Sequence, residues 1–420
     1  MPVKKILFIV PYTPNLIRVR PYNLIRHLSG RGLQVTLLTL WSDERERDSV
    51  HQLEPYVHRI VAERLPRWRS LWNCLVALPS SKPLQSVYCW EPALARRIDE
   101  LTRPEQGIAP FDVIHVEHLR GAPYGLYVKR LNAGRQVSIP VVWDSVDSIS
   151  LLFRQASERS KSLFSRAVTG FELGRTERYE GWLPEQFERV LVTSPADQRA
   201  LISLAPKEKN PPRITVLRNG VDLDYFKPDP SVEREPATLV ISGKMSYHAN
   251  ITMVVYFIEQ ILPRIWARRP ETRLLVVGKD PGREILALAN HPNIIVTGTV
   301  KDLPPYLQQA TVAVAPIAYG AGIQNKVLEA MACGTPVVTT PQAVSALEVS
   351  SGEDVLVAQE PADFANAVLS LLDGPQVRRR LGEAGRMYVE KHHKWDSIAG
   401  QLAGIYNEIP GSNSVELKNG

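Results

Sequence analysis

The sequence predicts an α/β protein made of two doubly wound domains, each with a parallel sheet. Short apolar runs recur along all 420 residues and alternate with longer segments of helical pattern, which is typical of strands joined by crossover helices. The length suits two domains of about 200 residues each. A hydrophobic content of 44% is enough for two cores. A Pro- and charge-rich stretch, residues 228–236, has the composition of an interdomain linker.

The first half is expected to form the N-terminal domain, residues 1–212. Its apolar runs predict strands at residues 6–10, 35–40, 113–116, 141–143 and 190–193. Helices are expected between them, at residues 19–28 and 92–101, together with one long polar helix over residues 150–179.

The second half is expected to form the C-terminal domain, residues 213–394, beginning with a junction strand at 213–217. Apolar runs predict strands at residues 239–241, 274–277, 294–296, 312–315 and 337–339, most of them followed by a helix. A final helix is expected over residues 395–410, and the polar segment 411–420 is expected to be a flexible tail.

Composition excludes several classes of protein. The apolar run 6–10 is closed by Pro11 with no small-residue cleavage site after it, so we do not expect it to be a signal peptide. No uncharged run approaches the roughly 18 residues that span a membrane. The three cysteines, Cys74, Cys89 and Cys333, lack metal-type spacing, which favours a reducing, cytoplasmic environment.

Charge is unevenly distributed. Residues 1–210 contain 30 Lys and Arg against 22 Asp and Glu, whereas residues 211–420 contain 20 against 22. The basic first half suits an anionic membrane surface or a lipid phosphate, although a solvated basic face explains it equally well. We expect no nucleic-acid partner, because no aromatic-basic motif for reading bases is visible.

Residues 320–338, GAGIQNKVLEAMACGTPVV, carry the strongest functional signal. They predict a glycine loop after strand 312–315, a helix from about residue 323 to 332, and a stop at Gly334. The free N–H groups and dipole of a helix N-terminus attract anions, and Lys326 in the first turn adds a cation. A carboxylate one turn later, Glu329, suits a ribose diol. The pattern indicates a nucleoside diphosphate site, with a plain strand-helix crossover as the alternative.

The run EAMACGTPVV over residues 329–338 resembles the donor-binding signature of GT-B fold glycosyltransferases of family 4, group 1. The resemblance implies that Glu329 contacts the ribose. It also implies a donor-binding role for four residues of the preceding loop and helix start, Gly322, Ile323, Gln324 and Asn325. The family usually has a second Glu eight residues before the first, where it holds the donor sugar. Here that position is Ala321, so the family resemblance does not indicate which donor sugar this protein uses.

Two further segments resemble the same family in the expected order. ITVLRNGVDLDYF, residues 214–226, is similar to the family's interdomain junction, which explains Asp222 and Asp224 without a metal. VISGKMSY, residues 240–247, is similar to the strand and loop that bind the diphosphate, implying that Gly243 binds the donor and that Lys244 stabilises the leaving group. The Met-x-Tyr-x-x-Asn pattern ending at Asn250 resembles a branch linked to exopolysaccharide assembly. Asn250 alternatively reads as a helix N-cap.

The resemblance assigns the acceptor to the first domain, and it implies that the final helix, 395–410, packs back onto that domain. The loop 11–21 lacks the family's paired glycines, and Arg18 and Arg20 are expected to contact the acceptor or the diphosphate instead, unless they are surface arginines at a helix start. Asp144 stands where many members have a His, so it is expected to orient an acceptor hydroxyl or accept its proton, or else to cap the next helix. His115 reads more simply as a satisfied residue at the edge of the core.

Residues 59–72, RIVAERLPRWRSLW, mix arginines with tryptophans and leucine. This composition suits a membrane interface or a platform for sugars. A partly buried helix with a basic rim is the alternative.

Together these features imply a retaining glycosyltransferase that uses a UDP- or GDP-linked sugar as substrate, without cofactor or metal. Lys244, Lys326 and the helix N-terminus would stabilise the departing diphosphate. The expected acceptor is a saccharide or a polyprenyl-diphosphate-linked precursor. The expected location is the cytoplasm, peripherally on the inner face of the membrane. Three alternatives remain: a catalytically inactive partner subunit, a nucleotide-sugar epimerase, and a dehydrogenase whose glycine loop would have Asn325 in place of its third glycine.

Overall fold

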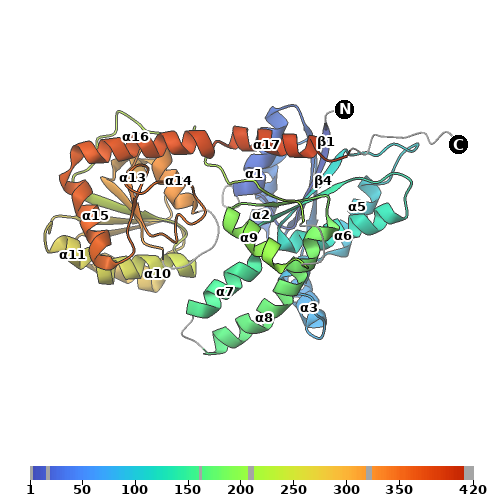
Figure 1. The fold of residues 1–420 in the computed structure, drawn as a ribbon, viewed down its shortest axis with the longest axis horizontal. Helices are drawn as coiled ribbons and strands as arrows, with labels where there is room; N and C mark the ends of the chain where they lie inside the picture. Colours follow the sequence, from blue (N-terminus) through green and yellow to red (C-terminus); the bar gives the residue numbers. More distant parts are fainter. Residues whose placement is uncertain (1–2, 16–18, 160–162, 207–211, 318–323, 411–420) are drawn as a thin grey trace. The chain divides into compact units, whose positions relative to one another are not determined.

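The computed structural model describes residues 3–15, 19–159, 163–206, 212–317 and 324–410. It divides into two compact units, the first containing residues 1–219 and 395–420, the second residues 220–394. Each unit is a parallel sheet with helices on both faces, as Figure 1 shows. The α/β class and the two doubly wound sheets that the sequence predicted are therefore confirmed.

The first unit is built on a seven-stranded sheet in the order β3-β2-β1-β4-β5-β6-β7, with every pair parallel. Its strands are β1 (Lys5–Val10), β2 (Gln34–Trp41), β3 (Arg59–Arg64), β4 (Val113–Glu117), β5 (Val141–Val146), β6 (Arg189–Val192) and β7 (Ile214–Val216). Its helices are α1 (Val19–Gly30), α2 (Glu44–Val50), α3 (Arg67–Ala77), α4 (Leu84–Val87), α5 (Pro92–Leu101), α6 (His118–Ala133), α7 (Ile149–Arg159), α8 (Leu163–Trp182), α9 (Pro195–Leu204) and α17 (Trp395–Asn407), with short 3₁₀ helices at His51–Tyr56 and Leu183–Gln186.

Side chains on β1 alternate between two cores, as the two-residue period of a strand requires. Leu7 and Ile9 pack into one core, and Ile6, Phe8 and Val10 pack into the other. The second of these cores is completed by α17, which lies along α1 (Figure 1). The side chains that α17 contributes are Trp395, Ile398, Ala399, Leu402, Ile405 and Tyr406. The last helix of the chain is therefore part of the hydrophobic core of the first unit.

The second unit has six parallel strands in the order β10-β9-β8-β11-β12-β13. The strands are β8 (Thr238–Ser242), β9 (Arg273–Val277), β10 (Ile294–Gly298), β11 (Val312–Ala315), β12 (Val337–Thr339) and β13 (Leu356–Val357). The helices are α10 (His248–Tyr256), a π-helical segment (Phe257–Ile261), α11 (Leu262–Trp266), α12 (Arg283–Ala287), a single turn (Leu288–Asn290), α13 (Pro304–Gln309), α14 (Asn325–Ala332), α15 (Pro361–Asp373) and α16 (Pro375–His392).

The expected boundary at residues 212/213 is wrong by seven residues. The junction strand β7 pairs with β6, its Ile214 is buried in a core of the first unit, and the Leu217 N–H donates to Val192 O. Because its backbone groups and side chain are satisfied by the first sheet, β7 belongs there, and the units divide between residues 219 and 220. The expected flexible tail, 411–420, lies outside the described residues.

Two further expectations are corrected. The long helix expected over 150–179 is two helices, α7 and α8. Residues 59–64, expected to be helical in the alternative reading of 59–72, form strand β3 at the sheet edge, where Ile60 and Val61 pair with Leu37 and Leu38. Adjacent β-branched residues favour a strand, and the flanking charges suit an edge.

Candidate active site

The helix α14 begins at the carboxyl edge of the second sheet, after β11. In the strand order, β8 leads to β9 and β10 on one side while β11 starts the other side, so β8 and β11 flank the topological switch point. Open α/β sheets bind ligands at that point. The predicted strand, helix and stop at Gly334 are present in the expected order. Gly334 has φ 66°, and Gly334 and Thr335 donate N–H groups to Met331 O and Ala330 O, which ends the helix.

Lys326 and Glu329 lie three residues apart on α14, and both are half-buried. Burial lowers the pKa of Lys326 to about 8, although the Glu329 carboxylate opposes that shift. Burial raises the pKa of Glu329 to about 7, with Lys326 opposing. Both groups therefore titrate near neutral pH. Perturbed pairs of this kind are typical of functional sites.

Three polar groups accompany the pair. Gln324, at the N-cap position, accepts a hydrogen bond from Lys326 Nζ at 3.3 Å. Asn325 Oδ1 is buried without a hydrogen-bond partner among the described residues. The pKa of the Tyr225 phenol is raised by burial, with Asp302 and Glu329 adding to the shift, which places Tyr225 near Glu329. The start of α14 thus presents N–H groups, an ammonium, a carboxylate and an unsatisfied amide oxygen together.

Gly243 and Lys244 follow β8, the neighbour of β11 in the sheet. Gly243 has φ 150°, and a Cβ there would lie 2.8 Å from Asn250 Nδ2, so this turn requires glycine. Lys244 is exposed at the same carboxyl edge. The N-cap reading of Asn250 is wrong, because Asn250 lies inside α10 and donates Nδ2 to Lys244 O at 2.9 Å. Asn250 therefore holds the loop that carries Lys244.

Arg20 and Asp144 form a buried ion pair within the first unit. Arg20 Nε and Nη2 each lie 2.8 Å from Asp144 Oδ2, and Arg20 Nη1 donates to Leu217 O and Asn219 Oδ1. The exposed fractions of Arg20 and Asp144 are 4% and 0%. Burial is the largest single effect and opposes ionisation of Asp144, but Arg20 and His115 together outweigh it and lower the Asp144 pKa to about 2.

The roles expected for Asp144 and Arg20 stay predictions, and the ion pair bears on both of them. A fully buried carboxylate with a pKa near 2 and an arginine partner is a poor proton acceptor for a substrate hydroxyl. Arg20 Nε donates to Asp144 and Nη1 donates to the 217–219 segment, whereas the buried Nη2 has no hydrogen-bond partner among the described residues. The pair instead ties α1 and β5 to the end of β7. Arg18 lies outside the described residues, as do Gly322 and Ile323.

His115 extends this network. Its Nδ1 lies 2.8 Å from the Tyr406 hydroxyl on α17, its Nε2 lies 3.6 Å from Asp144 Oδ2, and its ring stacks on Phe8. Burial lowers the pKa of His115, which favours the neutral imidazole. His115 is therefore a buried residue that connects α17 to the ion pair, and because its Nε2 has no hydrogen-bond partner among the described residues it is not the fully satisfied residue that the sequence suggested.

The Asp-x-Asp pattern is a turn. Asp222 Oδ1 accepts hydrogen bonds from the backbone N–H groups of Asp224 and Tyr225, each at 3.1 Å. Among the described residues there is no group of three or more His, Cys, Asp or Glu arranged to hold a metal ion.

A hollow of about 360 Å³ opens at the carboxyl ends of β1 and β2 in the first unit. It is lined by aromatic, basic and hydroxyl side chains, including Tyr12, Trp41, Ser42, Arg67, Tyr88 and Arg120. Arg64 and Arg47 each lie over the Trp41 ring, and Arg120 lies over the Tyr88 ring. Aromatic faces beside arginines suit a sugar or an anionic head group. Sequence reasoning had singled out the segments that contain Tyr12 and Arg67, but it missed Trp41, Ser42, Tyr88 and Arg120. Trp41 ends a predicted strand, which is a usable signal.

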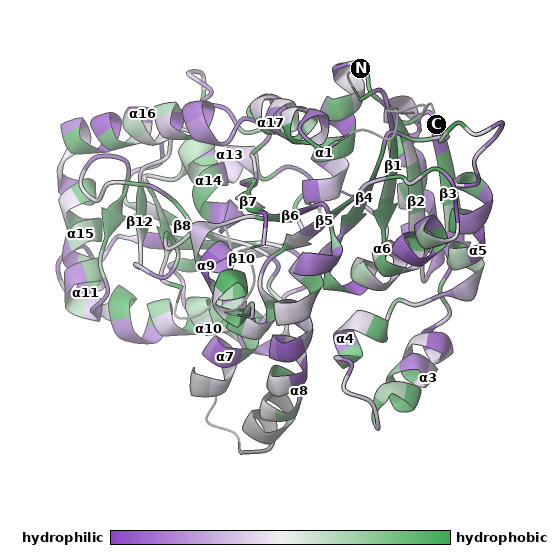
Figure 2. Ribbon diagram, turned by 45° about the vertical axis from the view of Figure 1, so that its right-hand side comes forward, coloured by the Kyte–Doolittle hydropathy of each residue, from purple (hydrophilic) through white to green (hydrophobic). Residues whose placement is uncertain are grey.

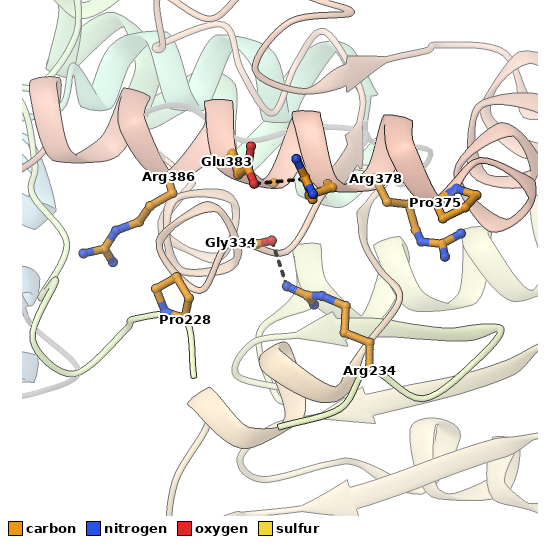
Figure 3. A pocket seen from close by; sticks show the side chains of 9 residues that line it. Pro228, Arg234, Gly334, Pro375, Arg378, Glu383 and Arg386 are labelled. Carbon is orange, nitrogen blue, oxygen red and sulfur yellow. Dashed lines mark hydrogen bonds and ion pairs between the residues drawn. The ribbon is translucent and has the colours of Figure 1, made fainter. Parts of the chain in front are cut away.

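A second hollow, of about 390 Å³, lies in the second unit among Arg234, Arg378, Arg379 and Arg386 (Figure 3). Three of these arginines donate to carbonyl groups at helix ends: Arg234 to Gly334 O, Arg378 to Leu371 O, and Arg386 to Ala332 O. Basic side chains stabilise the negative ends of helices. The arginines therefore have a structural explanation as caps of α14 and α15.

Comparison with known proteins identifies the family. A model described as Glycosyltransferase Family 4 matches residues 18–225, and one described as Glycosyl transferases group 1 matches residues 236–374. The chain belongs to the GT-B fold glycosyltransferases of family 4, group 1. The resemblance seen in the sequence is thus confirmed at the level of the family, while the exopolysaccharide branch stays a prediction.

Several curated members of the family are similar to this chain over part of its length. D-inositol 3-phosphate glycosyltransferase 2 of Catenulispora acidiphila is 26% identical over 244 residues, which is 52% of this chain and 56% of that protein. The glycogen synthase of Mycobacterium tuberculosis is 25% identical over 57% of this chain and 58% of its own length. The chain spans about half the length of the curated relatives it matches.

Solved structures share the fold across nearly the whole chain. Sucrose-phosphate synthase from Thermosynechococcus elongatus has a TM-score of 0.64 at 21% identity, covering 96% of this chain and 98% of its own. Anabaena HepE in complex with UDP has a TM-score of 0.66 at 15% identity, covering 96% and 99%. At these identities the likeness shows the GT-B fold alone.

Proposed function

We propose that this glycosyltransferase-family protein transfers a sugar from a nucleoside diphosphate donor to a hydroxyl group of an acceptor, with retention of configuration. One observation carries the proposal: the start of α14 brings N–H groups, Lys326 and Glu329 together at the switch point of the second sheet. The helix N-terminus and Lys326 suit the diphosphate, and Glu329 suits the ribose diol.

The leaving group is stabilised by charges already in place. As the anomeric carbon–oxygen bond breaks, negative charge develops on the diphosphate, and Lys326, Lys244 and the N–H groups of α14 offset it. Each preorganised hydrogen-bond donor of this kind increases the turnover rate by about 10²–10³-fold. Because Lys326 and the N–H groups belong to α14, and Asn250 holds the backbone of the loop that carries Lys244, we expect little reorganisation of the backbone during the step.

The proton of the acceptor hydroxyl needs a base, and Asp144 does not suit that role. In the proposed step the acceptor oxygen attacks the anomeric carbon from the same face of the sugar from which the diphosphate departs. The departing phosphate oxygen takes the hydroxyl proton, so charge and atoms balance without a protein base. The buried Arg20–Asp144 pair is compatible with this route, because the phosphate of the nucleotide sugar, and not Asp144, accepts the proton.

The hollow at the ends of β1 and β2 is the proposed acceptor site, because its aromatic and basic lining suits a saccharide or a diphosphate-linked head group. A polyprenyl-diphosphate-linked acceptor would place the protein peripherally on a cytoplasmic membrane surface. Among the described residues no helix is long and apolar enough to cross a bilayer. UDP- and GDP-linked sugars are the first donors to test, and no cofactor beyond the donor is expected.

An inactive partner subunit is the second candidate, since Asp144 is locked in an ion pair and Ala321 replaces the family's second Glu. A thermal-shift panel with UDP, GDP, ADP, TDP and NAD separates the candidates from one another. A ligand at 100 times its Kd stabilises the folded state by about 2.7 kcal/mol. A shift with one nucleoside diphosphate, followed by turnover of its sugar conjugate, supports the transferase. A shift without turnover supports the inactive subunit, and a shift with NAD alone contradicts both.

A further inference from the structure

The helix α3 has its apolar face toward solvent. Five large side chains, spaced as one helical stripe, have exposed fractions between 55% and 69%: Trp68, Leu71, Trp72, Leu75 and Val76. In a surface helix of a globular protein such a stripe normally faces the core. Figure 2 shows α3 at the rim of the first unit, away from the strands, with much of the helix coloured hydrophobic.

The opposite face of α3 is small and polar, and it is the face that packs inward. Ser70 and Ala77 are buried, Asn73 Nδ2 donates to Trp90 O at 2.7 Å, and Cys74 lies 3.9 Å from Leu84 O. Specific inward contacts of this kind fix the rotation of the helix about its axis. The outward orientation of the tryptophans and leucines is therefore set by packing.

Exposure of a contiguous apolar stripe of this size marks an interaction site. The surrounding charge indicates which partner it suits. Between residues 64 and 90 the chain has four basic residues and no acidic one. Two of the four, Arg67 and Arg69, lie in the first turn of α3, and Arg69 also approaches Glu91 at 3.5 Å. A second copy of the same face would bring like charges together, whereas an anionic surface would complement them.

The N-terminal part of α3 lines the hollow proposed for the acceptor. Arg67, Ser70 and Leu71 belong both to the helix and to that lining. A molecule lying along the apolar stripe would thus have its polar end at the aromatic and basic lining of the hollow.

We propose that α3 docks on an anionic lipid bilayer, with its Trp and Leu stripe in the boundary between head groups and acyl chains. Tryptophan favours that boundary, and amphipathic helices lie in its plane. Docking brings the hollow to the membrane surface, so the acceptor is a membrane-borne amphiphile with a polar head. The statement about the acceptor rests on the proposed function, whereas the statement about the bilayer does not.

The test is flotation of the full chain with 100-nm vesicles of phosphatidylcholine alone, or with about 30% phosphatidylglycerol. We expect binding to the anionic vesicles and at least roughly tenfold weaker binding to the neutral ones, because several basic residues flank the stripe. The double variant Trp72→Ser/Leu75→Ser is expected to lower the partition coefficient at least about 30-fold, since it removes two large apolar side chains from the stripe.

The matched control is Leu286→Ser/Met387→Ser, which removes two apolar side chains that are 50% and 62% exposed in the other unit. Loss of binding in the α3 variant alone, with an unchanged melting temperature, supports the inference. Equal vesicle binding by both variants overturns it. A dimer that the α3 variant abolishes, without vesicle binding by the wild type, overturns it in favour of self-association. Vesicle binding without any nucleotide binding supports the docking surface and contradicts only the proposed function.

Discussion

Replacing Lys326 with alanine tests the proposed donor site most directly. Lys326 lies half-buried in the first turn of α14, and its ammonium donates a hydrogen bond to Gln324 Oε1. A hydrogen bond to a charged group contributes about 1.5–3 kcal/mol. We therefore expect Lys326→Ala to raise the Kd for the cognate nucleoside diphosphate by about 10- to 150-fold. Turnover should fall at least about 30-fold, because the same charge acts on the leaving group.

The pH dependence of binding separates a direct contact from a structural effect. The pKa of Lys326 is lowered to about 8, so the free protein loses the ammonium as pH rises above that value. A diphosphate binds the protonated form, and affinity should therefore fall about tenfold between pH 8 and 9.5. Glu329, whose pKa is about 7, is already ionised over most of this range. In the alanine variant the profile should be flat.

The assay is isothermal titration calorimetry at pH 7.5 to 9.5, with radiolabelled donor for turnover. Lys391→Ala is the matched control, because it removes an exposed cation from α16 in the same unit. The reasoning is refuted if Lys326→Ala binds the nucleotide within threefold of the wild type. It is also refuted if the wild-type profile is flat across pH 8.

Three further predictions concern the first unit. Asp144→Asn should lower the free energy of unfolding by about 3–5 kcal/mol in urea titrations, because it leaves Arg20 buried without its counter-ion. A loss below about 1 kcal/mol would contradict a structural role for the pair. Since the folded pKa of Asp144 lies near 2, below its usual 3.8, the contribution of the pair should persist above pH 4 and disappear as pH falls through 2. Removing residues 395–420 should unfold the first unit, as judged by circular dichroism and proteolysis, whereas removal of 411–420 alone should not. Trp41→Ala should raise the acceptor KM at least about tenfold without changing nucleotide Kd, and an unchanged KM would remove the hollow from the acceptor site.

Much of the fold could be predicted because parallel strands buried on both faces have a strong local signature. Strands β11 and β12 and helix α5 have the bounds that their sequence indicated. The glycine stop at Gly334 was also readable, because positive φ and the helix end depend on neighbouring residues only. Strand β3 was missed because an edge strand rich in arginine and glutamate lacks the apolar run of a central one.

The sequence by itself determined the family, the two-domain plan and the helix that carries Lys326 and Glu329, since each depends on residues close together in the chain. Tertiary structure decided the rest. It paired Asp144 with Arg20, 124 residues away, and so gave a structural role to a residue expected at the chemistry. It also turned the apolar stripe of α3 outward, because the contacts of Asn73 with Trp90 and of Cys74 with Leu84, 17 and 10 residues along the chain, set which face of that helix meets solvent. Contacts between residues far apart in the chain leave no periodic pattern, and burial and partnership therefore become visible only when the chain is folded.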